Sequence, residues 1–394
     1  MAELNRMHLS DLRGASRMAF DATAGVVDVV ERMHSTIQQR PAPAGKARNI
    51  PTSGITGLVY RSVRGGVRLI GAGVDLSLAG VVRFLPEGKS APGRDALLAA
   101  VNGVYGDYLA RTGNPLAIGM SLRYEGRAVD VTDPRAAYRE TDGRALTSKL
   151  LVLVHGLCLS DLQWRRAGHD HGAALADELG YTPLYLRYNS GLDIQQNGRA
   201  LAGLLESLLH NWPFPVQELC IIGHSMGGLV ARSACLWAAE NAHDWLSQLG
   251  KLVFLGTPHH GAPLERAGSG LDFMLELSPY SAPLTPLGKS RSAGIQDLRY
   301  GVITPGGTQP PLPSEVACYA AAATLSRRRS LLADRLVGDG LVPLNSALGR
   351  HRTRAKSLGI PKTRQWIGYE MGHLELLSRP EVYTQLRIWL EDCA

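Results

Sequence analysis

Apolar residues recur at helical spacing through the first 115 residues of the chain. From residue 9 to 38 they form one stripe, with successive members three or four positions apart: Met18, Ala22, Val26, Val29, Met33 and Ile37. The same spacing recurs over 55–85, where glycines and arginines interrupt it, and again over 95–111. A repeat of about 3.6 residues is typical of amphipathic helices. The pattern therefore predicts an N-terminal helical segment over residues 1–115.

The spacing of the apolar residues changes at Leu116. Residues 116–124 and 127–131 flank Glu125–Gly126, as the two strands of a hairpin do. Further stretches of strand length follow, with a helical pattern in the linkers, at 150–154, 182–188, 219–222, 251–255, 315–320 and 365–369. Continuous apolar runs are typical of buried parallel strands, and strands that alternate with helices indicate a doubly wound sheet. Residues 116–394 are therefore expected to form an α/β domain with a mostly parallel sheet.

One of these strands leads into a Gly-x-Ser-x-Gly pentapeptide, Gly223–Gly227. The apolar run at 219–222 precedes it, and a helical pattern over 229–239 follows it. A strand, a tight turn and a helix hold a serine hydroxyl out at the carboxyl end of the strand. The glycines let strand and helix approach each other closely around the turn. The sequence therefore predicts Ser225 as a nucleophile.

A serine hydroxyl needs a base, a carboxylate that orients the base, and donors for the oxyanion. The carboxylate candidate is Asp339, which has a glycine on each side, and the base candidate is His373, which follows a strand and a glycine. Their order after the serine is the order of an α/β-hydrolase triad. The expected oxyanion donors are the backbone amides of Met226 and of Leu157, in the loop after the strand at 150–154. His224 is expected to point away from its neighbour.

Five segments resemble those of bacterial α/β-hydrolase lipases and esterases. They are VLVHGLC (152–158), IIGHSMGGLVAR (221–232), FLGTPHHGAPLE (254–265), VGDGLVP (337–343) and MGHLELL (371–377). Residues 256–261 are also similar to those of glycosylphosphatidylinositol-inositol deacylases and related lipases. The resemblance covers residues 116–394. It implies the α/β-hydrolase fold and ester hydrolysis through an acyl-enzyme.

Residues 262–314 are long enough to form a cap or lid. An apolar stretch at 271–277 lies between segments rich in proline and glycine, which are typical of mobile joints. Lipases of the resembling type commonly cover an apolar acyl pocket in this way. The alternative is a surface excursion that packs on the core and gates nothing.

Composition and charge limit the expected partners, cofactors and location of the protein. An apolar fraction of 45% and a charged fraction of 20% are typical of a soluble globular protein. The net charge of +7 suits either an ordinary solvated surface or contact with anionic lipid, and no nucleic-acid partner is expected. The five cysteines are widely spaced and predict neither a zinc site nor a disulfide framework, so no metal or other cofactor is expected. The first ten residues lack an apolar core and no apolar run could span a membrane, which favours a cytoplasmic protein.

The predicted function is a serine carboxylic-ester hydrolase, an esterase or lipase, acting on a small-molecule or lipid ester. The same triad would also serve an acyltransferase, a thioesterase or a polyester depolymerase, because the acceptor depends on pocket shape and access of water. A non-enzymatic alternative is a protein that binds a lipid surface through the basic, glycine-rich pattern at 55–85. That segment could equally pack within the protein.

Overall fold

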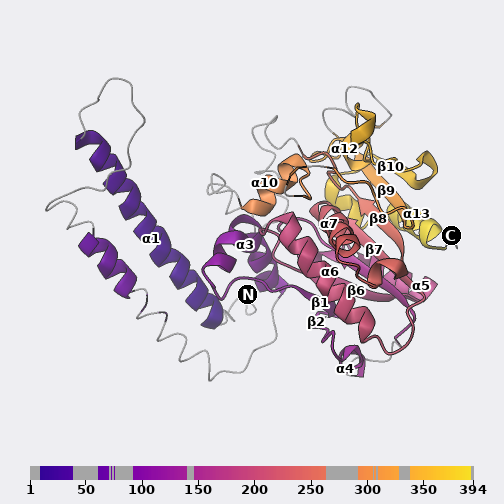
Figure 1. Cartoon of the computed structure of the whole chain (residues 1–394), viewed down its shortest axis with the longest axis horizontal. Helices are drawn as coiled ribbons and strands as arrows, with labels where there is room; N and C mark the ends of the chain where they lie inside the picture. Colours follow the sequence, from indigo (N-terminus) through magenta and orange to yellow (C-terminus); the bar gives the residue numbers. More distant parts are fainter. Residues whose placement is uncertain are drawn as a thin grey trace. The chain divides into compact units, whose positions relative to one another are not determined.

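The computed structural model describes residues 9–38, 61–70, 72, 75, 92–139, 146–262, 292–304, 306–307, 309–327 and 338–391. Figure 1 shows the chain, with the remaining residues as a thin trace. It divides into two compact units. The first contains Met1–Ala91 and Arg111–Leu116, and the second contains Pro92–Ala110 and Ala117–Ala394.

The first unit is built on the long helix α1 (Leu9–Gln38), which covers the range that the apolar stripe predicts. Arg13 on this helix makes a bidentate ion pair with Asp75, at 2.7 and 2.9 Å. A planar guanidinium matches a carboxylate in this geometry, which favours a fixed orientation of both side chains. Residues 61–70 are also helical, inside the stretch 55–85.

The second unit contains, within the described residues, an eight-stranded sheet in the order β10-β9-β8-β7-β3-β6-β1-β2. The strands are β1 (Ser121–Tyr124), β2 (Arg127–Ala128), β3 (Lys149–Val154), β6 (Thr182–Arg187), β7 (Glu218–His224), β8 (Leu249–Leu255), β9 (Ala317–Thr324) and β10 (Gln365–Tyr369). β1 pairs antiparallel with both β2 and β6, and the other neighbours pair in parallel. The predicted mostly parallel sheet with a hairpin at its start is confirmed. A separate ladder joins β4 (Arg165–Arg166) and β5 (His169–Asp170).

Helices cover both faces of the sheet, and the side chains of each strand divide between them. Leu150, Val152 and Val154 of β3 belong to an apolar cluster with α6 (Ile194–His210) and α7 (Met226–Glu240). The alternate residues Leu151 and Leu153 belong to a second cluster with α5 (His171–Leu179) and α13 (Pro380–Glu391). Successive side chains of a strand point to opposite faces, so a continuous apolar run fills two layers.

Shorter helices complete the second unit. They are α4 (Pro134–Arg139), η1 (Asp161–Trp164), α8 (Trp245–Gln248), α10 (Ala293–Tyr300), α12 (Leu344–Ala347), η3 (Arg354–Lys356), η4 (Lys362–Arg364) and η5 (His373–Leu377). Most of the predicted cap, with its apolar stretch at 271–277, lies outside the described residues. Among the helices that are described, none combines the length and the apolar character needed to cross a bilayer.

Helix α3 (Pro92–Arg111) belongs almost entirely to the unit that contains the sheet. The sequence interpretation groups it with the N-terminal segment and starts the catalytic domain at residue 116. The physical reason for the difference is its burial: Ala99, Ala100, Val104 and Leu109 are at most 2% exposed. Helical periodicity identifies the buried face of a helix but not the element that covers it.

Candidate active site

Ser225 lies at the carboxyl end of β7 and immediately before the first residue of α7. Its backbone has φ +53° and ψ −125°, a conformation that side-chain-bearing residues rarely adopt and that is held only by its surroundings. Its N–H donates to the carbonyl of Leu255 at 2.8 Å, and its carbonyl accepts from Gly228 at 3.1 Å. A Cβ on Gly227 would lie 2.2 Å from the carbonyl oxygen of Val154. The turn therefore needs the close approach that the glycines of the pentapeptide predict.

The structure brings Asp339 and His373 together. Nδ1 of His373 lies 2.7 Å from Oδ2 of Asp339, and the two residues are only 3% and 2% exposed. The other carboxylate oxygen accepts from the backbone N–H groups of Leu341 and Val342, at 3.0 and 2.8 Å. A carboxylate accepts, so Nδ1 carries the proton and Nε2 presents a lone pair. The pair is thus arranged as a carboxylate that orients a base.

His373 lies at the same edge of the sheet as Ser225. Parallel strands end at one edge, and both residues follow the carboxyl ends of strands in this set. Leu255, whose carbonyl accepts from Ser225, is followed by Gly256, where a Cβ would lie 3.0 Å from Cε1 of His373. Nε2 of His373 is buried and makes no hydrogen bond with any residue that the structure describes.

The two predicted oxyanion donors flank the serine. Met226 is the first residue of α7, and the first N–H groups of a helix have no acceptor within the helix. Leu157 lies in the loop after β3, where a Cβ on Gly156 would lie 3.0 Å from Cβ of Ser225. The loop and the start of the helix therefore enclose the serine from two directions.

The loop that contains Leu157 is fixed by the segment after β6. The hydroxyl of Tyr188 donates to the carbonyl of His155 at 2.8 Å, and their rings stack at 4.3 Å. The hydroxyl of Ser190 accepts from the N–H of Cys158 at 3.1 Å. Burial lowers the pKa of His155 to about 3, so this ring is neutral at physiological pH.

His224 is a neighbour of the candidate base that the sequence interpretation missed. The sequence interpretation expects His224 to point away from its neighbour and does not assign it to the site. In the structure its ring centroid lies 4.8 Å from that of His373. Its Nε2–H donates to the carbonyl of His373 at 3.3 Å. Burial lowers the pKa of His224 well below its usual value, so it adds no charge beside the base. The contact joins the end of β7 to the segment after β10, two strands that are not neighbours in the sheet, so the sequence pattern does not reveal it.

Cys158 has no nucleophilic character despite its place in the loop beside Leu157. The side chain is buried, and burial raises the pKa of its thiol to about 12. The thiolate is the reactive form of cysteine, so the group stays protonated and unreactive at neutral pH. This agrees with the sequence interpretation, which assigns the nucleophile to Ser225.

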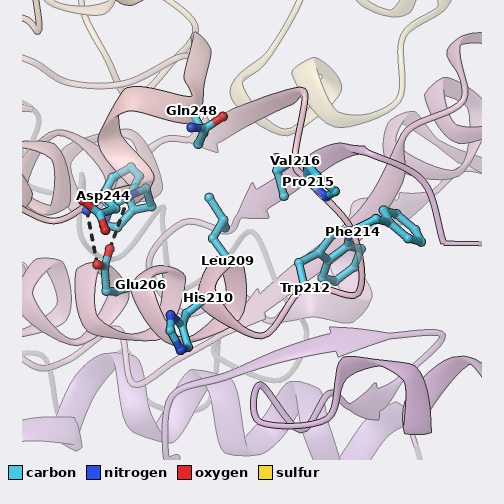
Figure 2. A pocket seen from close by; sticks show the side chains of 10 residues that line it. Glu206, Leu209, His210, Trp212, Phe214, Pro215, Val216, Asp244 and Gln248 are labelled. Carbon is cyan, nitrogen blue, oxygen red and sulfur yellow. Dashed lines mark hydrogen bonds between the residues drawn. The ribbon is translucent and has the colours of Figure 1, made fainter.

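A cavity of about 470 Å³ lies at the amino end of β7, whereas Ser225 follows its carboxyl end (Figure 2). It is lined mainly by Leu209, Trp212, Phe214 and Trp245, with the Glu206 carboxylate accepting from backbone N–H groups on its wall. The amino end of a parallel strand is remote from the edge that carries Ser225, so this cavity is not part of the candidate site. In the described ranges no cluster of His, Cys, Asp and Glu side chains could hold a metal ion.

Part of the chain matches a known domain. Residues 146–309 match the model of the PGAP1-like alpha/beta domain. Among solved structures, the mature lipase BlEst2 of Bacillus licheniformis is 18% identical, with a TM-score of 0.43 and coverage of 63% of this chain and 93% of that chain. A lipase-esterase related protein of Clostridium acetobutylicum is 14% identical, with a TM-score of 0.35 and coverage of 61% and 94%.

Potato epoxide hydrolase I is 13% identical, with a TM-score of 0.38 and coverage of 62% of this chain and 93% of that chain. No functionally curated protein matches the sequence. The family match spans β3 to α10 and includes Ser225 with the loop that contains Leu157. The described sheet thus has the α/β-hydrolase fold, and residues 146–309 within it match a PGAP1-like alpha/beta domain.

Proposed function

We propose that the protein is a serine hydrolase of carboxylic esters. The observation that carries the proposal is the buried Asp339–His373 pair, at the same sheet edge as the strained Ser225 that precedes α7. A serine hydroxyl, an imidazole and the carboxylate to which that imidazole is hydrogen-bonded are the parts that activate a hydroxyl for acyl transfer. Esters with hydrophobic acyl groups are proposed from the resemblance of the five motif segments to those of lipases and esterases.

In the first half-reaction, Oγ of Ser225 attacks the ester carbonyl carbon while Nε2 of His373 takes the hydroxyl proton. The carbonyl oxygen becomes an oxyanion, which the backbone N–H groups of Leu157 and Met226 stabilise. The C–O bond to the leaving alcohol then breaks, and the imidazolium gives its proton to that alcohol. An acyl group remains on the serine.

The second half-reaction uses water as the nucleophile. His373 takes one proton from water, the hydroxide attacks the acyl carbon, and the same amides hold the second oxyanion. Collapse releases the carboxylic acid, and the proton returns to Ser225. The Asp339 carboxylate supports the positive charge that forms on the imidazolium, while its other oxygen accepts from the two backbone N–H groups.

The test is steady-state hydrolysis of p-nitrophenyl acetate and butyrate by Ser225→Ala. The substitution removes the nucleophile, and we expect kcat to fall by about 10⁴-fold or more, with an unchanged thermal transition. Ser247→Ala is the matched control, because this exposed serine lies near the amino end of β8. The control is expected to keep the wild-type kcat. Retained hydrolysis in Ser225→Ala would show that another group performs the reaction.

A further inference from the structure

Helix α3 lies against the loop that contains Leu157. The side of the helix at Gly103 faces Cys158, so that a Cβ added to Gly103 would lie 2.2 Å from Sγ. The same Cβ would lie 3.0 Å from both the N and Cα atoms of Cys158. The thiol also points at the carbonyl of Ala100, 3.9 Å away. Backbone therefore packs directly on backbone here, without space for a methyl group.

The loop at this contact holds a conformation that its own sequence does not favour. Cys158 has φ +59°, in the left-handed region that residues with a Cβ avoid. Such a residue keeps its geometry only where the surrounding structure fixes it. The fixing contacts are Gly103 on one side and the Ser190 hydroxyl, which accepts from the N–H of Cys158, on the other.

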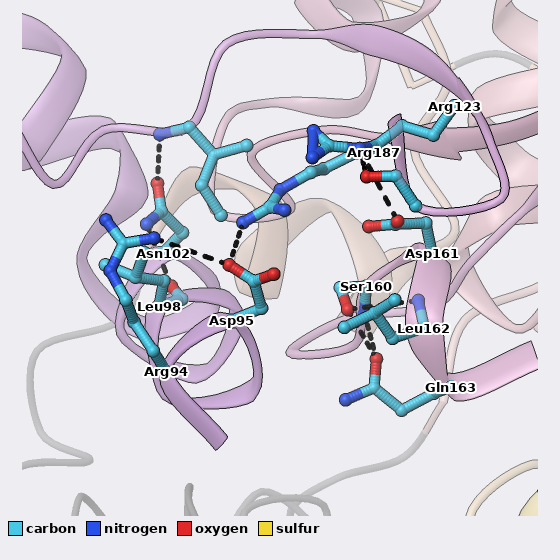
Figure 3. A network of polar contacts seen from close by, with 12 residues as sticks. Arg94, Asp95, Leu98, Asn102, Arg123, Ser160, Asp161, Leu162, Gln163 and Arg187 are labelled. Carbon is cyan, nitrogen blue, oxygen red and sulfur yellow. Dashed lines mark hydrogen bonds and ion pairs between the residues drawn. The ribbon is translucent and has the colours of Figure 1, made fainter. Parts of the chain in front are cut away.

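Helix α3 is itself anchored firmly to the sheet unit. Asp95 on its first turns accepts from the Arg187 guanidinium of β6 at 2.8 Å, and both side chains are buried (Figure 3). Further along the helix, Asn102 accepts from the N–H of Ile118 at 2.9 Å. The carbonyl of Gly103 accepts from the Ser292 hydroxyl at 2.7 Å. A Cβ at Gly103 would therefore displace the loop rather than the helix.

We propose that Gly103 is a positioning residue that sets the place of the Leu157 amide through its contact with Cys158. The proposal rests on the proposed function, because it assigns that amide to the oxyanion. The two loop residues share one peptide bond, so a displacement of Cys158 moves its neighbour. An oxyanion donor must lie about 2.7–3.1 Å from the oxygen, so a shift of a few tenths of an ångström weakens it.

The test substitutes Gly103→Ala in the full chain and measures kcat and KM for p-nitrophenyl butyrate. We expect kcat to fall about tenfold or more, whereas KM changes less than about twofold, because the amide acts on the tetrahedral state and not on the bound ester. Gly203→Ala is the matched control, a helical glycine of α6 where a Cβ would meet no atom within 4 Å. The control should keep wild-type values.

A second substitution separates positioning from a general loss of structure. Cys158→Ala removes Sγ, the atom nearest to the added methyl group, but leaves the backbone contacts, so the variant with both changes should regain part of the kcat lost in Gly103→Ala. Cys158→Ala alone should remain active. Unchanged kcat in Gly103→Ala would overturn the inference, and so would a loss that Cys158→Ala does not relieve. Neither result would affect the proposed function, which Ser225→Ala tests separately.

Discussion

His373 is held at two points, its imidazole ring and its backbone carbonyl. The Asp339 carboxylate accepts from its ring at Nδ1, and the ring of His224 donates to its backbone carbonyl. The first contact fixes the tautomer, and the second fixes the start of η5, the short helix that begins at this residue. Sequence reasoning identifies Asp339 because glycines flank it, but the contact of His224 depends on how two strand ends meet.

We predict that His224→Phe lowers kcat without preventing folding. Phenylalanine keeps an aromatic ring but removes the N–H that the carbonyl of His373 accepts. A hydrogen bond of this kind contributes about 1 kcal/mol, so a decrease of roughly fivefold to tenfold in kcat is expected. The measurement is hydrolysis of a p-nitrophenyl ester. His224→Gln, which retains an N–H donor, is the control and should lose less. Equal activities in the two variants would show that the donor does not position the base.

At the turn from β7 into α7, glycines allow the strand and the helix to approach each other closely. A Cβ on Gly223 would lie 2.5 Å from Cα of Gly228, and one on Gly228 would lie 2.0 Å from Oγ1 of Thr257. Strand and helix therefore lie in contact with each other and with the segment after β8. This packing holds Ser225 in the turn between the end of the strand and the first residue of the helix.

We predict that Gly228→Ala lowers the free energy of unfolding by about 1–3 kcal/mol, because the added methyl group overpacks the contact with Thr257. Alanine has the higher helix propensity, which offsets the loss by at most about 1 kcal/mol. The measurement is urea denaturation. Gly203→Ala is again the control, because it gains the propensity without a clash, and its stability should be unchanged or higher. A stability of Gly228→Ala equal to that of the control would contradict this account.

The bounds of the strands can be compared with those that the apolar pattern predicts. The apolar run at 150–154 and the predicted strand at 365–369 agree with β3 and β10 within one residue. The strand at 315–320 is displaced, since β9 extends to Thr324 through four alanines. Alanine is a weak strand former, but parallel pairing with β8 and β10 on both sides overrides this preference. Local propensity cannot report such pairing.

For the molecule as a whole, the sequence predicts the sheet and proposes the residues of the candidate site, but it groups α3 with the N-terminal segment rather than with the sheet unit. Ser225, Asp339 and His373 each follow a predicted strand or glycine turn, so their convergence could be expected from the parallel order. The place of α3 could not be expected in this way. Its apolar residues recur at the same helical spacing as those of α1, and this spacing does not say which element covers the helix. The contact between Gly103 and Cys158 joins residues 55 positions apart and belongs to no motif.

The most direct test of the central claim is covalent labelling with diethyl p-nitrophenyl phosphate. In this reaction Oγ of Ser225 attacks phosphorus, His373 takes the proton, and p-nitrophenolate leaves. The account predicts one equivalent of p-nitrophenolate per chain, loss of ester hydrolysis, and a diethylphosphoryl group on the peptide that contains Ser225. A label on another residue, or hydrolysis that continues after Ser225 is fully labelled, would contradict it.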